Sequence, residues 1–316
     1  MSIWSRSYWS RVYGRYQPHL TSGWVSQIVT ILFLTLSLIV IGLILFNNWD
    51  TITSIEWQIR PIWLLYIILF FTIDLLVATW VWHLLVVRLA NYRNFRQSAK
   101  ICWHANLARR IPTPVWYIAG RALMYEKVGV KKTTTSLLST LELLFFFLSG
   151  LATTLLTLPF WAIPTEITQN TNPWLLLILL LPLSLLFIHP RLLEKVWRRV
   201  RPDIPLEPLR WRDTITWLGY YILAWIFGAF VLFSLLNLLY PVPLSELITV
   251  IGMWSLAGSI SLAGALTISV IGVREISLAL LLTLLVPAPI ALITAILIRV
   301  VWLLGEITSA LVSFKL

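Results

Sequence analysis

The chain has 316 residues, of which 59% are hydrophobic and 12% are charged, against roughly 45–50% and about 25% in a soluble globular domain. Lys and Arg number 24 and Asp and Glu 13, a net charge of +11. This composition, with several nearly uncharged stretches of about 20 residues, excludes a soluble enzyme, a disulfide-rich secreted scaffold and a disordered tail. We therefore expect an all-α, polytopic integral membrane protein.

The N-terminal segment, 1–24, carries three arginines and no acid, and it leads into a first apolar run at 25–46. That run is too long for the apolar region of a signal peptide, so we expect an uncleaved first membrane helix. After 239 a run of small residues reaches 273, and apolar sequence continues to about 312. The chain thus predicts about seven or eight membrane segments, and four further spans are expected at 61–87, 134–158, 173–188 and 214–239.

Most of the basic residues lie in three places, at 1–24, 88–132 and 191–213, and among them 88–132 holds ten Lys or Arg with a single acid. The intervening loops hold only Arg60 among the basic residues. By the positive-inside rule the N-terminus and both basic loops are cytoplasmic, in a multi-pass protein of the plasma membrane. The same rule accounts for the basic excess without nucleic acid, so we expect anionic lipid and not nucleic acid as the partner.

Residues that could hold a cofactor are sparse. The single cysteine, Cys102, has no cysteine partner, and the four histidines are scattered along the chain. No Gly-rich loop with the spacing of a nucleotide-binding motif occurs. We therefore expect no metal, no cofactor and no catalytic residue of a recognisable kind.

The first interrupted segment lies within 94–126. Arg93, Arg96, Lys100 and His104 recur at intervals of three to four residues, which predicts an amphipathic helix at the cytoplasmic interface. Further along, between Arg110 and Arg121, only ten uncharged residues occur, about half of a span, and two prolines interrupt them. The pattern predicts a re-entrant hairpin that enters from the basic side and turns at Pro112 and Pro114.

The second interrupted segment lies within 252–289. Arg274 and Glu275 interrupt its apolar sequence, and only eleven apolar residues follow before Pro287. Interrupted segments in both halves are typical of transporters built from inverted repeats. We treat 1–316 as one transmembrane domain with a first half, 1–133, middle spans, 134–213, and a second half, 214–316. Small residues that permit close helix packing precede the charged pair: Gly252, Ser255, Gly258, Ser259, Ser261, Gly264 and Ser269.

Two groups of residues also carry a family resemblance. The segments Arg110-Ile111-Pro112, Trp116, Gly120-Arg121 and Gly272-Val273-Arg274-Glu275 resemble the signature segments of the lysylphosphatidylglycerol synthase transmembrane-region family, which are flippase-like membrane domains. Glu142 and Arg299 resemble family positions as well. The resemblance implies movement of an anionic or aminoacylated phospholipid, or of a polyprenyl-phosphate-linked glycan, between leaflets. The aminoacyl-transfer domain of the full synthase would follow the membrane region, so with a chain end at Leu316 we expect no synthase activity.

The candidate substrate-binding residues follow from charge and position. Arginine side chains present forked donors that suit a lipid phosphate, and Trp116 would stack on a sugar or line the pathway. Ionisable residues inside a membrane segment are functional candidates by default. Interfacial anchoring and structural packing remain open for each of them. The candidates are Arg109, Arg110, Trp116, Arg121, Glu142, Arg274, Glu275 and Arg299.

Three alternatives to a plain transport site stay open. A carboxylate–arginine pair that joins Glu142 or Asp74 to Arg274 or Arg299 would be a structural lock or a proton-linked gate. The chain would otherwise be an accessory membrane subunit that anchors a partner transferase, or a lipid-linked-sugar glycosyltransferase that uses Asp50 in the first outer loop. The sequence carries no signal for an oligomeric state.

Overall fold

The computed structural model describes residues 46, 59–108, 114–161, 186–200, 208–265 and 272–313. The chain divides into two compact units, 1–47 and 48–316. All of the first unit except Phe46 lies outside the described residues, so the expected first span does too, as does most of the expected span at 173–188. The elements below belong to the second unit.

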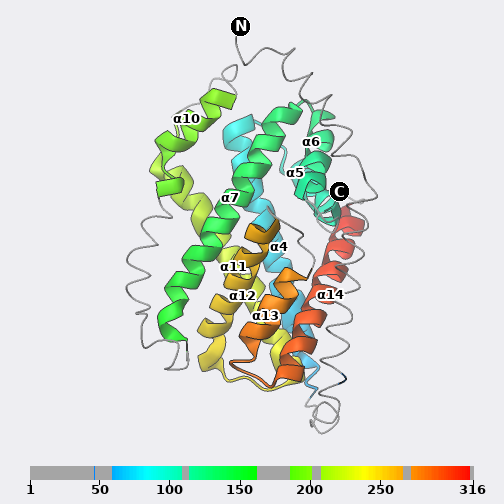
Figure 1. Cartoon of the computed structure of the whole chain (residues 1–316). Helices are drawn as coiled ribbons and strands as arrows, with labels where there is room; N and C mark the ends of the chain where they lie inside the picture. Colours follow the sequence, from blue (N-terminus) through cyan, green and yellow to red (C-terminus); the bar gives the residue numbers. More distant parts are fainter. Residues whose placement is uncertain are drawn as a thin grey trace. The chain divides into compact units, whose positions relative to one another are not determined.

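The described part of the second unit is built from α-helices and short 3₁₀ turns, and no strand occurs among its described residues (Figure 1). This confirms the all-α prediction. The helices are α4 (Ile62–Ala90), α5 (Phe95–Ala108), α6 (Pro114–Glu126), α7 (Lys132–Thr157), α10 (Pro190–Val200), α11 (Trp211–Leu239), α12 (Leu247–Ala265), α13 (Val273–Leu282) and α14 (Ala288–Ser313), with 3₁₀ turns η1 (Leu158–Phe160) and η2 (Leu244–Glu246).

Five of these helices are long and apolar enough to cross a membrane. A bilayer core of about 30 Å requires about 20 helical residues, and each of the five has 21 or more. Three of them coincide with the runs expected at 61–87, 134–158 and 214–239, and the other two, α12 and α14, lie in the apolar C-terminal third. The five segments are Ile62–Ala90, Lys132–Phe160, Trp211–Leu239, Leu244–Gly264 and Ala288–Ser313.

Helix α11 is the most buried of the five and packs against α4, α7 and α12. It runs antiparallel to α4. At one end the Arg60 N–H donates to the Leu238 carbonyl, and at the other end Arg88 pairs with Asp213. On another side α7 packs against α11, where the rings of Phe146 and Trp225 stack with centroids 4.3 Å apart. Helix α11 therefore forms the centre of the described core.

The contact of α12 with α7 and α11 depends on glycine. A Cβ atom at Gly258 would overlap the indole of Trp225, and one at Gly252 would overlap Thr157 and Trp161. Close approach of helices through small residues is how membrane helices gain packing contacts without a hydrophobic driving force. The prediction that this small-residue run permits close packing is confirmed at both glycines.

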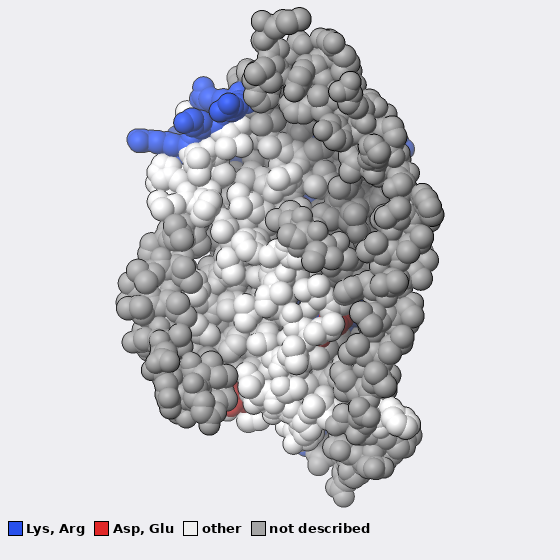
Figure 2. All heavy atoms as spheres, in the orientation of Figure 1, with Lys and Arg blue, Asp and Glu red and all other residues white. Residues whose placement is uncertain are grey.

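Basic side chains gather at one end of the unit. The end of α4, the start of α7 and the start of α11 meet there. Nearby, α10 buries Leu193 and Trp197 and exposes Arg198 and Arg199, a pattern typical of a helix on a membrane surface. Figure 2 shows a group of Lys and Arg side chains in the region of α10, and few charged side chains on the rest of the white surface in that view.

Helices α5 and α6 lie in the chain between the end of α4 and the start of α7, and both of these points are at the basic end. Trp103 of α5 donates a 2.9 Å hydrogen bond to Thr79, which lies eleven residues before the end of α4. At 1.5 Å per residue this is about 16 Å from that end. Pro114 is the first residue of α6, a position that suits proline, whereas Arg109 to Pro112 lie outside the described residues.

The amphipathic pattern of the 94–108 segment falls on α5. Helix α5 is amphipathic, with Arg96 exposed, but its other face buries Ala99, Cys102 and Ala105. That face contacts α4, α6 and α14. Small residues such as these allow close helix contact, so the apolar face of α5 packs against other helices.

Candidate functional site

The described site residues fall into two clusters. Arg121 and Glu142 meet in the first, and Arg274, Glu275 and Arg299 meet in the second. Arg109 and Arg110 lie outside the described residues, and for Trp116 only its place in α6 is described.

The first cluster surrounds Arg121 of α6, whose side chain is completely buried. Its guanidinium forms an ion pair with Glu142 of α7 and donates a second hydrogen bond to Cys102 Sγ of α5 at 3.1 Å. The hydroxyl of Tyr117 donates to the same carboxylate oxygen of Glu142 at 2.7 Å. Burial of both charges is tolerated because each one has an ionic partner and a further hydrogen bond.

Aromatic rings enclose the same guanidinium. Its central carbon lies 3.8 Å from the ring centroid of Trp82 on α4 and 4.2 Å from that of Tyr117. The indole N–H of Trp82 donates to the hydroxyl of Tyr125 at 2.9 Å, which fixes the Trp82 ring. Four helices, α4 to α7, are therefore joined around one cation. In this conformation the side chain of Arg121 has no exposed surface.

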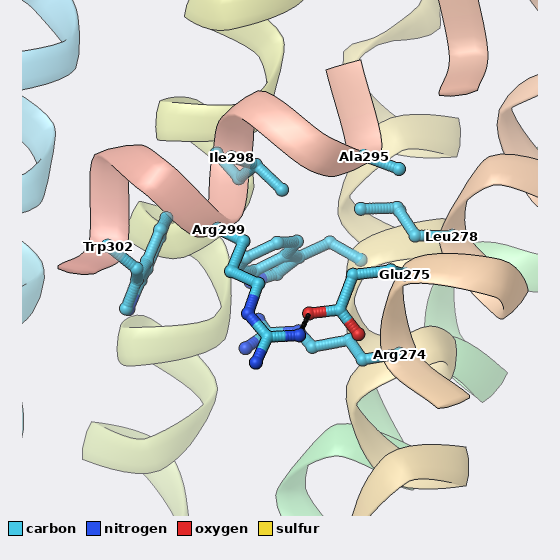
Figure 3. Close-up of a pocket in the computed structure, with 8 residues that line it drawn as sticks. Arg274, Glu275, Leu278, Ala295, Ile298, Arg299 and Trp302 are labelled. Atoms are coloured by element: carbon cyan, nitrogen blue, oxygen red, sulfur yellow. Dashed lines mark hydrogen bonds and ion pairs between the residues drawn. The ribbon is translucent and has the colours of Figure 1, made fainter. Parts of the chain in front are cut away.

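The second cluster lies where α13 begins beside α14 (Figure 3). Glu275 Oε1 accepts a 2.9 Å ion pair from Arg299 Nη1, and Glu275 Oε2 accepts the N–H of Gly272 at 3.1 Å. Gly272 has φ +92°, a left-handed conformation that glycine adopts without a Cβ clash. One carboxylate thus caps the first turn of α13 and binds the neighbouring helix.

Arg274 lies against two tryptophans. Its guanidinium carbon is 3.9 Å from the ring centroid of Trp254 on α12 and 5.8 Å from that of Trp302 on α14. Such cation–π contacts are worth about 0.5–2 kcal/mol, with the larger values in desolvated surroundings. Arg274 therefore links α13 to both helices that flank it.

The second cluster is the more accessible of the two. The side chains of Arg299 and Glu275 are 38% and 19% exposed, against 1% and 7% for Arg121 and Glu142. Arg274, Glu275, Arg299 and both tryptophans line a cavity of about 30 Å³, about the volume of one water molecule. A small polar group can therefore reach the arginine and the carboxylate of the second cluster only.

Both clusters lie at depth in the helices. Glu142 is ten residues from the start of α7 and Arg299 eleven residues from the start of α14, which is about 15–16 Å along each axis. Gly305 and Trp302 of α14 pack on Phe71 of α4, so this part of α14 lies beside the apolar part of α4.

The fold and these clusters define a multi-pass, helical membrane protein with charged groups inside its apolar helices. Comparison with protein-family models found no match, and comparison with curated protein sequences found none either. Among the described residues, no three His, Cys, Asp or Glu side chains group together as metal ligands would. The chemistry of the described site comes from arginine, carboxylate and indole groups.

Two ion pairs of the described residues are ones that the sequence does not suggest. Glu142 pairs with Arg121 and Arg299 with Glu275, whereas the sequence points to Arg274 or Arg299 for Glu142. Trp254 and Trp302 are site residues that the sequence does not single out. Their only sequence signal is an indole in an apolar helix at a distance from the expected span ends, and that signal names no partner.

Proposed function

We propose that this protein binds the phosphate-bearing headgroup of an anionic lipid inside the membrane and moves that lipid between leaflets. The second cluster carries the proposal, because Arg274, Glu275 and Arg299 bring charge into the apolar helices at the start of a half-length helix. An ionisable side chain at such a depth costs about 2.5–3.5 kcal/mol on insertion scales, so a role beyond packing is the default expectation.

The chemistry of the cluster fits a phosphate ester. Arginine presents paired N–H donors whose spacing matches two phosphate oxygens. Arg299 is the most exposed of the ion-paired residues in the two clusters, and its partner Glu275 is partly exposed too. A phosphate that displaced Glu275 from Arg299 would also remove the carboxylate that caps α13, so binding would be coupled to movement of this helix.

The two short helical elements support a transport role. We infer that α5 and α6 form a re-entrant hairpin that enters from the basic end. We also infer that α13 belongs to a half-length element at the opposite end, where a short turn joins the end of α13 to α14. Half-length elements entering from opposite sides are typical of transporters built from inverted repeats. With the basic end in the cytoplasm, as the positive-inside rule requires, the hairpin opens to the cytoplasmic leaflet of the plasma membrane.

A lipid-scrambling assay tests the proposal. The purified full chain is reconstituted into phosphatidylcholine vesicles that contain a fluorescent phosphatidylglycerol. A membrane-impermeant quencher is added, and the rate at which probe from the inner leaflet reaches the outer leaflet and loses its fluorescence is followed. We expect lipid exchange to be faster than in protein-free vesicles. We expect Arg299→Gln to exchange lipid about tenfold more slowly than the wild type, a change that corresponds to about 1.4 kcal/mol.

The matched control is Lys132→Gln, which removes one partner of the exposed Lys132–Glu126 pair (2.9 Å). We expect this variant to exchange lipid at the wild-type rate. Wild-type protein that exchanges phosphatidylglycerol no faster than empty vesicles would contradict transport of this lipid and would favour an anchored accessory subunit.

A further inference from the structure

A large pocket opens at the basic end, well separated along α4 from the second cluster. It lies between the end of α4, the start of α7 and the start of α11, and its volume is about 840 Å³. Small-molecule sites in proteins usually have volumes of about 300–1,000 Å³. The pocket is therefore large enough for a headgroup-sized ligand.

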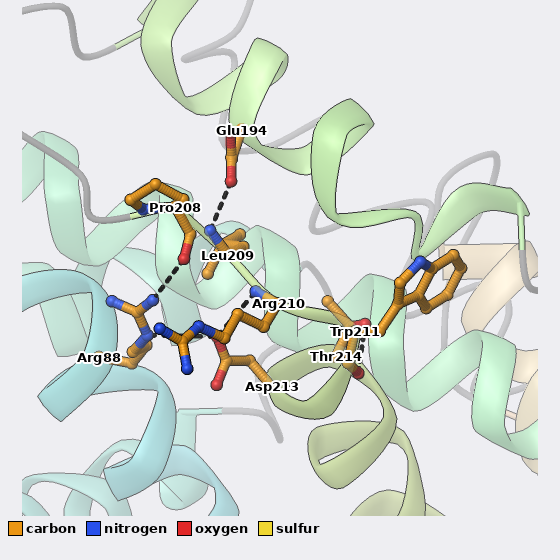
Figure 4. A network of polar contacts seen from close by, with 8 residues as sticks. All are labelled: Arg88, Glu194, Pro208, Leu209, Arg210, Trp211, Asp213 and Thr214. Atoms are coloured by element: carbon orange, nitrogen blue, oxygen red, sulfur yellow. Dashed lines mark hydrogen bonds and ion pairs between the residues drawn. The ribbon is translucent and has the colours of Figure 1, made fainter.

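Four basic side chains and one carboxylate line this pocket. The carboxylate, Asp213, is already engaged: it lies 3.4 Å from Arg88 Nε and accepts the N–H of Arg210 at 3.0 Å (Figure 4). Arg88 also donates to the Pro208 carbonyl at 2.8 Å. These contacts hold Arg88 and Asp213 against the start of α11. The basic lining residues are Arg88, Arg93, Lys131 and Arg212.

Arg93 and Arg212 differ from Arg88. Both are exposed, and neither forms an ion pair with another residue in the part of the chain that the structure describes. Arg93 lies just after α4 and Arg212 lies in the first turn of α11, and the antiparallel packing of α4 and α11 brings them to one pocket. Two guanidinium groups facing one cavity form an arrangement that favours a multiply charged oxyanion.

The start of α7 adds to the positive electrostatic potential in the pocket. Lys131 and Thr134 line the pocket, and α7 begins at Lys132 with no side-chain cap and no acid in its first turn. The first N–H groups of a helix lack intrahelical acceptors, and the helix dipole favours an anion near them. The start of α7 therefore reinforces the positive potential that the arginines create.

The pocket wall is apolar on its membrane side. Leu84 and Val87 lie in the last two turns of α4, and Trp217 lies in the second turn of α11. Both helices are among the candidate spans. A cationic rim above an apolar wall matches an amphiphile whose phosphate meets the water and whose tails enter the membrane.

We propose that this pocket is a binding site for a phosphate-bearing anion, supplied by a membrane lipid headgroup or by soluble phosphate. The site involves none of the residues of the α13–α14 cluster, and the proposal stands whether or not the protein transports lipid. In a lipid carrier, this pocket would recruit the headgroup at the cytoplasmic surface.

The test measures binding to the full chain in neutral detergent by isothermal titration calorimetry. The probes are dioctanoylphosphatidylglycerol, dioctanoylphosphatidylcholine and sodium phosphate, each at matched ionic strength. Binding of both phosphatidylglycerol and inorganic phosphate supports recognition of the phosphate itself, and binding of phosphatidylglycerol alone supports a lipid site. Failure of both to bind overturns the proposal, as does equal binding of the phosphatidylcholine.

Variants assign the binding to the pocket. Arg93→Gln with Arg212→Gln is expected to weaken binding at least tenfold, whereas Arg93→Lys with Arg212→Lys retains most of it because the charges remain. The control is Arg198→Gln with Arg199→Gln, which removes two charges from the exposed face of α10 outside the pocket. Equal losses in the two glutamine pairs would show that surface charge alone attracts the probe, and would overturn the site. Because detergent offers no leaflets, these outcomes do not depend on the scrambling assay.

Discussion

Glu275 and Arg299 connect the first turn of α13 to the middle of α14 through an ion pair of 2.9 Å. The second carboxylate oxygen of Glu275 accepts the Gly272 N–H at 3.1 Å, so the same side chain also caps α13. Movement of the Glu275 side chain therefore changes both how α13 begins and how it contacts α14. This coupling gives the accessible cluster a role that the enclosed Arg121–Glu142 pair does not share.

The two functions of Glu275 are separable by substitution. Glu275→Gln keeps an oxygen that accepts the Gly272 N–H but loses the charge that binds Arg299, whereas Glu275→Ala loses both. We expect Glu275→Gln to slow lipid exchange with a small change in stability, and Glu275→Ala to lower the free energy of unfolding by about 1–2 kcal/mol as well. Scrambling rates and thermal unfolding followed by tryptophan fluorescence measure the two effects.

Identical unfolding temperatures for these two variants would contradict the capping role of Glu275. The control is Glu126→Gln, which breaks an exposed ion pair. Such pairs contribute little, so neither stability nor exchange should change.

The buried pair makes a different prediction. Arg121→Met or Glu142→Gln alone leaves one charge without its ionic partner in a closed cluster, which typically costs about 3–5 kcal/mol. The double variant Arg121→Met with Glu142→Gln removes both charges, so we expect it to recover much of that loss. Unfolding temperatures of the two single variants and the double variant, in one detergent, form the measurement. Losses that simply add would show that the two side chains are not coupled.

The glycine contacts of α12 are testable with a matched glycine. Gly258→Val places side-chain atoms in the space of the Trp225 indole, and we expect a loss of about 1–3 kcal/mol from overpacking. Gly219 of α11 has open space where a Cβ atom would lie, so Gly219→Ala should leave stability unchanged or slightly raised. Thermal unfolding distinguishes the two, and similar losses at both positions would contradict close packing at Gly258.

The left-handed backbone at Gly272 predicts a graded response. Gly272→Ala forces a Cβ into φ +92°, at a cost of about 1–2 kcal/mol. Asparagine tolerates left-handed conformations better, so Gly272→Asn should cost less. Unfolding temperatures rank the variants, and Arg299-dependent lipid exchange should fall in the same order because Gly272 donates to Glu275. Equal tolerance of both residues would indicate a different backbone conformation at this position.

Much of the fold could be predicted from local sequence. The runs at 61–87, 134–158 and 214–239 are helices long enough to span a bilayer, and Gly252 and Gly258 allow close packing as expected. Within 94–126 the structure describes two short helices, α5 and α6, and α5 packs against α4, α6 and α14, neighbours that the sequence does not name. Amphipathicity identifies an apolar face and does not identify what covers it.

Hydropathy and spacing by themselves determined that this is a helical membrane protein, because the bilayer thickness sets a helix length that any apolar run either reaches or does not. Only the tertiary structure decided which charges meet: Arg121 with Glu142, Glu275 with Arg299, and Arg93 with Arg212 at one pocket. The physical reason is how far apart along the chain the interacting residues lie. A helix depends on contacts three or four residues apart, whereas an ion pair between helices requires two distant segments to pack in one register within a few ångströms.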